Sequence, residues 1–280
     1  MKHIYIIFTV LMISCSSREQ KLSNNDWQSV GIAKECNFVE RVDTLGLIVL
    51  YPRFSSLELV CGIEPKKSDS TVIIFAEGAY TGQCLNKFSH NNIAGDHVSG
   101  GIRYKGYPCK RHTGAFVYYD GAWEFCYKNY SNKMDKVAAA GGIAFTQELI
   151  IYNGKPVPIV RKDGNRNQFR ALCDTHDNKL CIIESDSIVT FGEFRKRLLQ
   201  LEVSNALYLD MGSGWNYAWY RKGNSIIELH PKTHNYCTNW ITFYKWKRIY
   251  LILAALMLLS LVPMPYGYYM LVRFVAMVVF

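Results

Sequence analysis

The chain has 280 residues, a formal net charge of +9 at pH 7 and an isoelectric point near 9.0. The excess of basic residues favours anionic partners, such as phosphorylated glycans or a membrane surface. The sequence shows no DNA- or RNA-binding motif, no internal repeat and no low-complexity tract, which argues against a nucleic acid as its partner.

The first 15 residues have the pattern of an export signal. Lys2 precedes an apolar run over residues 4–13, and small polar residues follow it. Cys15 stands where the lipobox of bacterial lipoproteins has its acylated cysteine, although an ordinary signal peptide with an incidental cysteine is the alternative. Residues 16–35, rich in Ser, Asn, Gln and Lys, are expected to form a tether. We therefore expect an exported protein, anchored to the membrane in a bacterial cell envelope.

The middle of the chain has the pattern of antiparallel β-structure. Three apolar, β-branched runs predict strands, at residues 46–51, 57–61 and 71–75. The last run is expected to be central in its sheet because it is apolar throughout. Two dipeptides are strong signals for hairpin turns, Asp120-Gly121 and Asn153-Gly154. We predict an α+β fold of mostly antiparallel sheets with few helices, forming a single domain over residues 36–245.

A helix and a strand lead to the polar residue that stands out most. Thr190 and Glu193 have the spacing of a capping box, in which each side chain satisfies a backbone N–H of the first helical turn. The residues that then form one apolar helix face are Phe194, Leu198 and Leu201. A buried strand is predicted over residues 206–209, and it ends at Asp210. A carboxylate there, close to a glycine, is typical of a binding site, and a capped turn is the alternative.

Three further segments carry residues suited to a site. Glu77 follows the strand at 71–75 much as Asp210 follows its own strand. A partly exposed carboxylate at a strand end, with no role in a site, is the equal alternative. Asp96 and His97 lie in a glycine-rich loop whose backbone N–H groups and imidazole suit a phosphate, while a loop histidine often has only a structural role. Gly141 belongs to a run of small residues that permits close packing of the backbone.

Arg170 lies inside a strand pattern, where a basic residue is unusual. A guanidinium is always charged and binds phosphate oxygens with two parallel hydrogen bonds, which suits an anionic substrate. A buried structural ion pair between Arg170 and Asp210 is the alternative.

Eight cysteines remain when Cys15 is set aside, an even number that permits disulfides in an exported chain. They are Cys36, Cys61, Cys84, Cys109, Cys126, Cys173, Cys181 and Cys237. The best local pair is Cys173 with Cys181, because they flank a polar turn on strands expected to pair. The sequence has no Cys-x-x-Cys, and no histidine lies at ligand spacing from two cysteines, so we predict no metal site.

The end of the chain, residues 246–280, is a hydrophobic tail. An uncharged run over residues 249–262 just reaches the length of a membrane-spanning helix when it is extended through the following prolines. The tail resembles a separate small bacterial membrane protein, as if a neighbouring reading frame had been fused and cut short. If the domain is exported, Lys245, Lys247 and Arg248 lie outside the membrane, against the positive-inside preference. The orientation of this tail is left open.

Four elements in the same order resemble the C-terminal half of the phosphodiester glycosidase family. The family has a strand with Arg-Thr-Ala, its hairpin partner, a Thr-x-x-Glu helix and then Asn-Leu-Asp-Gly-Gly-Gly-Ser. Here the corresponding segments are residues 168–171, 179–184, 190–193 and 208–213. The family's Ile-Asn-Gly-Gly-Phe-Phe segment corresponds to residues 75–80, which would place Glu77 across the pocket from Asp210. Its Ala-x-Gly-Gly-Gly-Pro stretch corresponds to the run around Gly141.

The resemblance implies hydrolysis of a sugar-1-phosphodiester at the anomeric carbon, without a cofactor, in envelope glycan metabolism. It implies that Arg170 holds the phosphate, and that Asp210 or Glu77 is a general base or stabilises oxocarbenium character. The residues expected to bind substrate are Gly212, Ser213, Asp96, His97, Gly141, Trp215 and Asn216. Two departures from the family pattern, Met211 in place of a glycine and Tyr208 in place of an asparagine, are expected to reshape the pocket.

The alternative function is a catalytically silent, lipid-anchored module that binds a glycan or a cell-wall polymer. Its binding surface would be the aromatic run of Trp215, Tyr217 and Trp219, whose rings stack on sugar faces in that reading. Aromatic residues after a turn are also common as ordinary strand packing.

Overall fold

The computed structural model describes residues 38–81, 93–107, 109–158, 161–212, 216–232 and 237–246. The predicted signal peptide with Cys15, the tether and the hydrophobic tail after Trp246 lie outside these residues. Within the described ranges, no helix is both long enough and apolar enough to cross a membrane. The segment boundaries expected at residues 15, 35 and 245 stay predictions.

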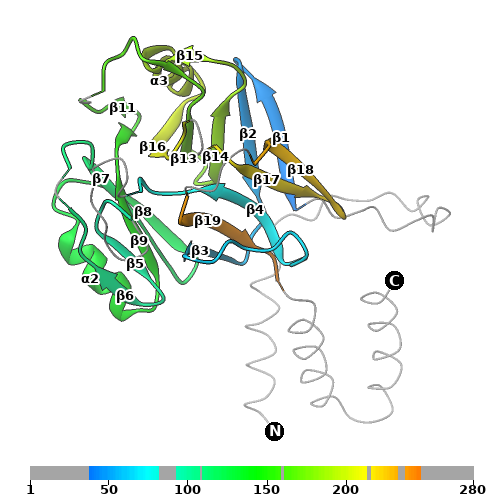
Figure 1. Ribbon diagram of the computed structural model, residues 1–280. Coiled ribbons are helices and arrows are strands. Elements are labelled where there is room, and N and C mark those ends of the chain that lie inside the picture. Colours follow the sequence, from blue (N-terminus) through cyan, green and yellow to red (C-terminus); the bar gives the residue numbers. More distant parts are fainter. Residues whose placement is uncertain are drawn as a thin grey trace, which may run out of the picture. The chain divides into compact units, whose positions relative to one another are not determined.

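Antiparallel sheets make up most of the described chain (Figure 1). Sheet A has seven strands, in the order β1 (Val39–Thr44), β2 (Leu47–Pro52), β14 (Leu180–Ser185), β13 (Arg170–Thr175), β16 (Val203–Leu209), β10 (Leu149–Tyr152) and β11 (Lys155–Pro156). Sheet B has five, in the order β18 (Ser225–His230), β17 (Ala218–Lys222), β4 (Val72–Glu77), β19 (Asn239–Tyr244) and β3 (Ser56–Cys61). Sheet C has five, in the order β6 (Ile102–Tyr104), β5 (His97–Ser99), β9 (Ile143–Gln147), β7 (Gly114–Tyr119) and β8 (Ala122–Tyr127). A short ribbon pairs β12 (Arg166–Asn167) with β15 (Val189–Thr190).

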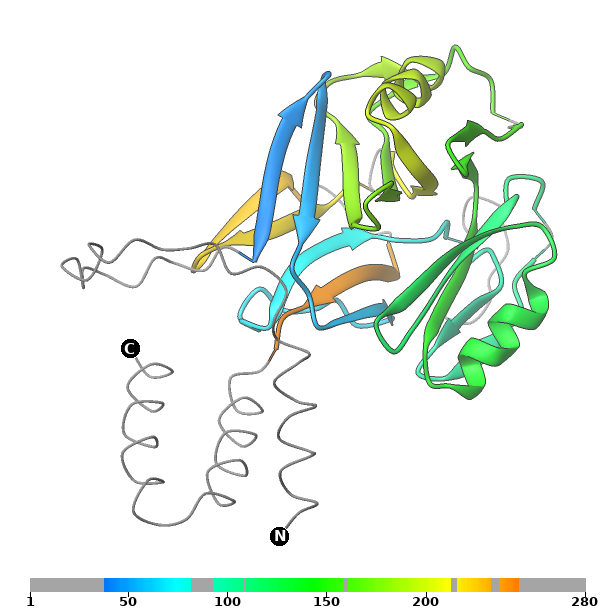
Figure 2. The ribbon, with the colours of Figure 1, turned by 180° about the vertical axis from the view of Figure 1, so that it is seen from behind.

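Two helices accompany the sheets in the part of the chain that the structure describes. α2 (Ser131–Ala139) packs against sheet C, and α3 (Phe191–Gln200) packs against β10, β11 and β16 of sheet A. Seen from behind, the two helices lie at opposite ends of the domain (Figure 2). The prediction of mostly antiparallel sheets with few helices is confirmed.

Strands β10, β13 and β14 of sheet A have sequences of continuous apolar runs because both of their faces are buried. Leu172 and Leu207 point into a core that they share with residues of the other two sheets, such as Ile241 and Phe116. Their neighbours along the same strands, which include Ala171 and Tyr208, point to the opposite face, which α3 covers. A strand whose successive residues are all buried cannot show the alternation of a half-exposed strand.

The predicted start of α3 is confirmed. Thr190 is the N-cap residue, and its side chain accepts a hydrogen bond from the backbone N–H of Glu193. The Glu193 carboxylate accepts in turn from the Thr190 backbone N–H at 2.7 Å, which completes the capping box. The expected apolar face is buried at Phe194 and Leu198.

Both predicted hairpin turns form. Asp120 and Gly121 connect β7 to β8 with φ angles of 49° and 76°, and Asn153 and Gly154 connect β10 to β11 with φ angles of 51° and 71°. Positive φ at both central residues matches the right-handed twist of the flanking strands. The run at residues 71–75 forms β4, which is the central strand of sheet B, as its uniform apolarity predicted.

Cys173 and Cys181 lie directly opposite each other on β13 and β14, as expected, and both are free thiols. The Thr175 N–H donates to the Lys179 carbonyl at 3.1 Å, so odd-numbered positions of β13 form the hydrogen-bonded pairs of this ladder. At such pairs the Cα atoms are about 5.5 Å apart, a separation that a disulfide can span, so the two thiols face each other across the ladder as an unbonded pair.

Candidate functional site

The ends of three strands from two sheets bring Glu77, Arg170 and Asp210 together. Arg170 begins β13 and lies opposite Leu209, the last residue of β16. The next residue, Asp210, donates its backbone N–H to the carbonyl of Gly78 at 2.7 Å, directly after the end of β4 at Glu77. The three residues singled out from the sequence therefore share one place in the fold.

Asn239 fixes the backbone segment that follows Glu77. Its side-chain oxygen accepts from the Ala79 N–H at 2.7 Å, and its side-chain nitrogen donates to the Ala79 carbonyl at 2.9 Å. A Cβ atom at Gly78 would lie 2.7 Å from the same Asn239 oxygen, so only glycine permits this close approach. Asn239 could not be predicted as part of the site, because an asparagine at a strand start gives no sequence signal of a distant backbone partner.

Replacing Asn239 with Ala is expected to destabilise the protein by about 1–3 kcal/mol, because it leaves the buried N–H and C=O of Ala79 without partners. The measurement is the urea midpoint of the purified variant. The Asn132→Ala change is the control, since that side chain is exposed on α2 and its backbone is helical. An Asn239→Ala midpoint equal to that of the wild type would contradict this role.

Arg170 is fully buried and held by a carboxylate that the sequence analysis did not identify. Its Nε donates to Glu184 at 2.7 Å, and its Nη2 donates to the backbone carbonyl of Asn216 at 2.9 Å. His230 bonds the other carboxylate oxygen of Glu184. The considered ion pair between Arg170 and Asp210 is therefore replaced by one between Arg170 and Glu184.

The charge of Glu184 is secured by its surroundings. Burial raises its pKa, but the Arg170 charge and the hydrogen bond from His230 outweigh burial and hold the pKa below its usual range. Arg170 thus has a permanent counter-charge on one side. Its Nη1 nitrogen is buried and has no hydrogen-bond partner among the residues that the structure describes.

Glu77 and Asp210 are two buried carboxyl groups that disfavour each other's charge. Burial is the main cause that raises the pKa of Glu77 to about 8; the Arg170 cation opposes it and the Asp210 charge adds to it. Burial likewise raises the pKa of Asp210 to about 7, against hydrogen bonds from the backbone of Thr81 and Met211 and against nearby cations. Within the described ranges, Oε2 of Glu77 and Oδ2 of Asp210 have no hydrogen-bond partner.

The unpaired polar atoms of Glu77, Asp210 and Arg170 indicate what kind of ligand the site can bind. Buried polar atoms in proteins are nearly always hydrogen-bonded, so each exception needs an explanation. Here two carboxylate oxygens and a guanidinium nitrogen are unpaired at neighbouring strand ends. A ligand with a phosphate and hydroxyl groups would satisfy all three.

The raised pKa of Glu77 makes the stability of the protein depend on pH. Because the folded pKa of about 8 lies above the ordinary value of 4.5, the unfolded chain loses its proton first as the pH rises. The contribution of Glu77 to the free energy of unfolding is therefore largest below pH 4.5. It falls between pH 4.5 and pH 8, by about 1.4 kcal/mol per pH unit at most.

We expect Glu77→Gln to flatten the dependence of the unfolding free energy on pH between 5 and 8. Urea denaturation at several pH values measures it, and the exposed Glu124→Gln variant serves as the matched control with the wild-type slope. If Glu77→Gln and the wild type had parallel profiles, Glu77 would ionise normally in the folded protein.

The structure places the other predicted substrate-binding residues in varied surroundings. Asp96 forms an ion pair with Arg103 at 2.9 Å and accepts the Gly106 backbone N–H. His97 is fully buried, with Nδ1 3.1 Å from the Gly95 carbonyl and its ring stacked on Tyr104. These contacts agree with a structural role for Asp96 and His97. They do not bring either side chain to Glu77 and Asp210.

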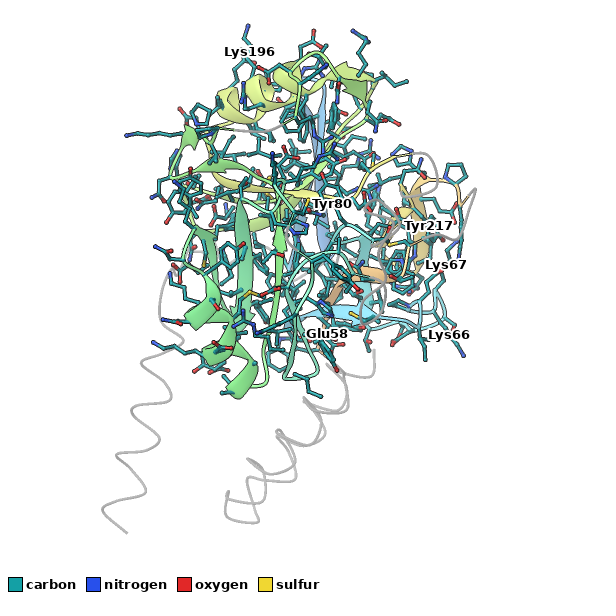
Figure 3. The ribbon with its side chains drawn as sticks, turned by 60° about the vertical axis from the view of Figure 1, so that its left-hand side comes forward. Glu58, Lys66, Lys67, Tyr80, Lys196 and Tyr217 are labelled. Carbon is teal, nitrogen blue, oxygen red and sulfur yellow. The ribbon has the colours of Figure 1, made fainter. Side chains whose placement is uncertain are left out.

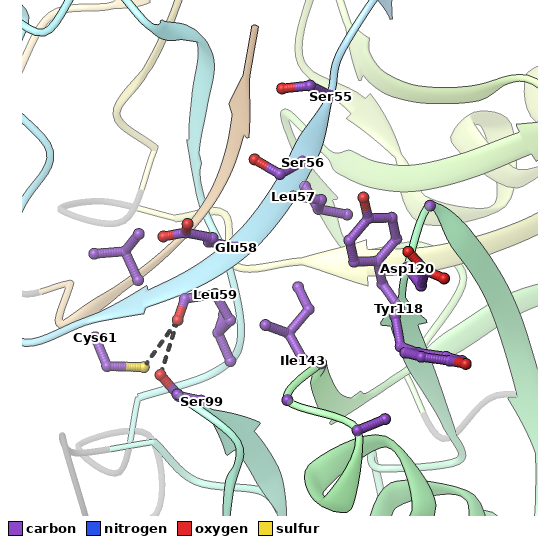
Figure 4. A pocket seen from close by; sticks show the side chains of 17 residues that line it. Ser55, Ser56, Leu57, Glu58, Leu59, Cys61, Ser99, Tyr118, Asp120 and Ile143 are labelled. Carbon is purple, nitrogen blue, oxygen red and sulfur yellow. Dashed lines mark hydrogen bonds between the residues drawn. The ribbon is translucent and has the colours of Figure 1, made fainter. Parts of the chain in front are cut away.

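Gly141 lies in the turn after α2 and lines a groove of about 670 Å³ beside β3. Ser99 and Tyr118 face this groove from sheet C, and the Ser99 hydroxyl donates to the Leu59 carbonyl (Figure 4). Neither Glu77, Arg170 nor Asp210 lines the groove, so Gly141 is not brought to the carboxyl pair.

The residues around the turn after Asp210 are partly described. Gly212 has open space where a Cβ atom would lie, and Asn216 contributes its backbone carbonyl to Arg170. Ser213 and Trp215 lie outside the described residues.

The remaining aromatic residues of this run pack inside the protein. Trp219 is fully buried and stacks on Phe75, and Tyr217 contacts the edge of the same ring. Tyr217 lies beside Lys67, whose Nζ is 5.5 Å from the ring centre (Figure 3). This is strand packing rather than an open platform for sugar rings.

Among the described residues, no group of three or more His, Cys, Asp or Glu side chains is arranged to hold a metal ion. The acidic residues at the strand ends instead have arginines as their charged neighbours.

The fold is shared with solved structures. The chain superimposes with a TM-score of 0.51 on the catalytic domain of zebrafish N-acetylglucosamine-1-phosphodiester alpha-N-acetylglucosaminidase, auto-inhibited by its pro-peptide, at 12% identity over 75% of this chain and 82% of that one. A hypothetical protein from Synechocystis gives the same TM-score and identity over 74% of this chain and 61% of its own. No family model and no curated protein matches the sequence. At this identity the likeness concerns the fold.

Proposed function

We propose that this chain is a hydrolase that cleaves sugar-1-phosphodiesters at the anomeric carbon, with Glu77, Arg170 and Asp210 as its catalytic residues. The observation that carries the proposal is the meeting of two buried carboxyl groups of raised pKa with a buried guanidinium whose Nη1 is unpaired. The fold that the chain shares with a phosphodiester glycosidase catalytic domain supports it.

Arg170 has the task of binding the phosphate. Glu184 and the Asn216 carbonyl hold Nε and Nη2, so Nη1 is the nitrogen left for a substrate oxygen. The guanidinium is already desolvated and oriented before the substrate arrives, so Nη1 can bind a phosphate oxygen without reorganisation.

The two carboxyl groups have different tasks because their surroundings separate their pKa values. Asp210 has backbone hydrogen bonds and cations that favour its charged form, and Glu77 has the higher pKa. The two groups titrate as a coupled pair near neutral pH, so one can hold a proton while the other is charged, and we assign the proton to Glu77. Glu77 then donates a hydrogen bond to the phosphate, and Asp210 takes the proton from the attacking water or stabilises oxocarbenium character at the anomeric carbon.

The reaction places modest demands on acid catalysis. The bond between the anomeric carbon and the phosphate oxygen breaks, water supplies the new oxygen on the sugar, and the phosphomonoester leaves with the bonding electrons. A phosphomonoester is a good leaving group, so charge stabilisation and a positioned water carry most of the catalytic effect. Arg170 and Asp210 supply these two functions.

The experiment that tests the proposal is a turnover assay on purified full-length protein with a panel of sugar-1-phosphodiesters. Phosphorus NMR follows each diester as it becomes a phosphomonoester. Turnover by the wild type supports the hydrolase. Tight glycan binding without turnover of any diester would instead support the non-catalytic glycan-binding module.

We also propose that the enzyme acts in the bacterial cell envelope, exported and membrane-anchored, on phosphorylated glycans. The N-terminal pattern ending at Cys15 and the net charge of +9 support this placement. Mass spectrometry of the mature N-terminus tests the anchor, because acylation at Cys15 changes the mass of the first peptide.

A further inference from the structure

A second buried charge cluster adjoins Asp210, and no feature of the sequence pointed to it. Arg161 is its centre, with a side chain only 9% exposed. Its Nε and Nη2 donate to one carboxylate oxygen of Glu148, at 3.2 and 3.1 Å, and Nη2 also bonds the Tyr80 hydroxyl. Glu148 is fully buried, so this ion pair is shielded from water.

Aromatic rings hold the same guanidinium from another side. Its central carbon lies 4.3 Å from the ring centre of Tyr208 and 4.8 Å from that of Phe191. Such contacts between a cation and a ring face are favourable, and they fix the plane of the guanidinium. Arg161 therefore binds β16, α3 and the segment after β4 at one point.

Two of the residues that Arg161 contacts, Tyr80 and Tyr208, lead directly to Asp210. The Tyr208 hydroxyl donates to the Met211 carbonyl at 3.0 Å, which fixes the turn after Asp210. Tyr80 precedes Thr81 in the chain. The backbone groups that hydrogen-bond the Asp210 carboxylate belong to Thr81 and Met211.

Several charged or titratable groups of the surrounding elements interact with Asp210. The Asp210 charge raises the pKa values of Glu77 from β4, Tyr80 from the segment after it, Tyr208 from β16 and Cys237 before β19. The cations Arg111 and Arg161 lower the pKa of Asp210 itself. Arg161 is the buried one of the two cations, and it lowers the pKa that burial raises. A phosphate bound at Arg170 would add a negative charge nearby, which makes this counter-charge more important.

We propose that Arg161 is a positioning residue that keeps Asp210 ionised and oriented while an anionic substrate is bound. The two arginines thus divide the work, with Arg170 binding the phosphate and Arg161 maintaining the carboxylate. This inference rests on the proposed function of Asp210. It explains why the place where the family resemblance expects asparagine is occupied by Tyr208, whose ring the guanidinium covers.

The test is a direct titration of Asp210 by carbon NMR of the full-length protein, with the signal assigned by its loss in Asp210→Asn. Arg161→Met is expected to raise the pKa of Asp210 by about one unit, and Arg161→Lys by less. Because Arg161→Met leaves Glu148 buried without its partner, the double variant Arg161→Met with Glu148→Gln provides a version expected to fold.

The single variant Glu148→Gln is the reference for the double variant, because both lack the Glu148 charge. Equal Asp210 pKa values in Glu148→Gln and in the folded double variant would overturn the inference. With an active wild type, the acid limb of kcat/KM should move to higher pH by the same amount as the NMR pKa. The two proposals fail separately, since a shifted pKa in a protein without any turnover refutes the hydrolase while the control of Asp210 by Arg161 stands.

Discussion

Asp210→Asn is expected to reduce kcat/KM on a sugar-1-phosphodiester by about 10²- to 10⁴-fold, the range for loss of a positioned general base. The amide keeps the size and the hydrogen-bonding shape of the carboxyl group but can neither take a proton nor stabilise positive charge. It also removes a buried carboxyl group whose pKa of about 7 costs stability at alkaline pH. The variant should therefore fold at least as well as the wild type at pH 8.

The matched control is Asp174→Asn. Asp174 is also a buried aspartate of sheet A with a raised pKa, but it lies at the opposite end of β13 from Arg170 and binds Asn205 and Trp123. Its variant should keep wild-type turnover. Asp210→Asn and Asp174→Asn with equal activity would remove Asp210 from the catalytic group.

Arg170→Met is expected to have the largest effect on both folding and activity. Removing the guanidinium leaves the Glu184 carboxylate buried with only His230 as its polar partner, which typically costs about 3–5 kcal/mol. It also removes the nitrogen proposed to bind the phosphate. The measurements are the free energy of unfolding by urea and the turnover of the diester.

A double variant separates the two roles of Arg170. Arg170→Met combined with Glu184→Gln removes both buried charges, so most of the lost stability should return. Activity should not return, because the phosphate still has no partner. A folded double variant with wild-type turnover would show that Arg170 serves only the architecture of sheet A.

The fold was predictable where local chemistry and tertiary structure agree. The capping box at Thr190, the two hairpin turns and the central position of β4 follow from residue types at fixed spacings, and each forms as expected. α2 was missed because its mean hydropathy is low and only Met134 and Val137 are buried. The small residues that follow it, around Gly141, predicted only close packing of the backbone.

The candidate site was predictable only in part, because its support comes from long-range pairing. Glu77, Arg170 and Asp210 were found as polar residues at the ends of apolar strands. A signal for Glu184 was present, since pairing Cys173 with Cys181 also places Arg170 opposite Glu184. Nothing in the local sequence relates Arg161 to Tyr208, because the two residues lie far apart in the chain and meet only in the folded structure.

The measurement that tests the central claim most directly is hydrolysis of a sugar-1-phosphodiester in ¹⁸O-labelled water. Mass spectrometry then locates the label in the two products. Cleavage at the anomeric carbon predicts label on the released sugar and none in the phosphomonoester. Label in the phosphomonoester would mean attack at phosphorus, and it would contradict the assignment of Asp210 and Glu77 to chemistry at the anomeric carbon.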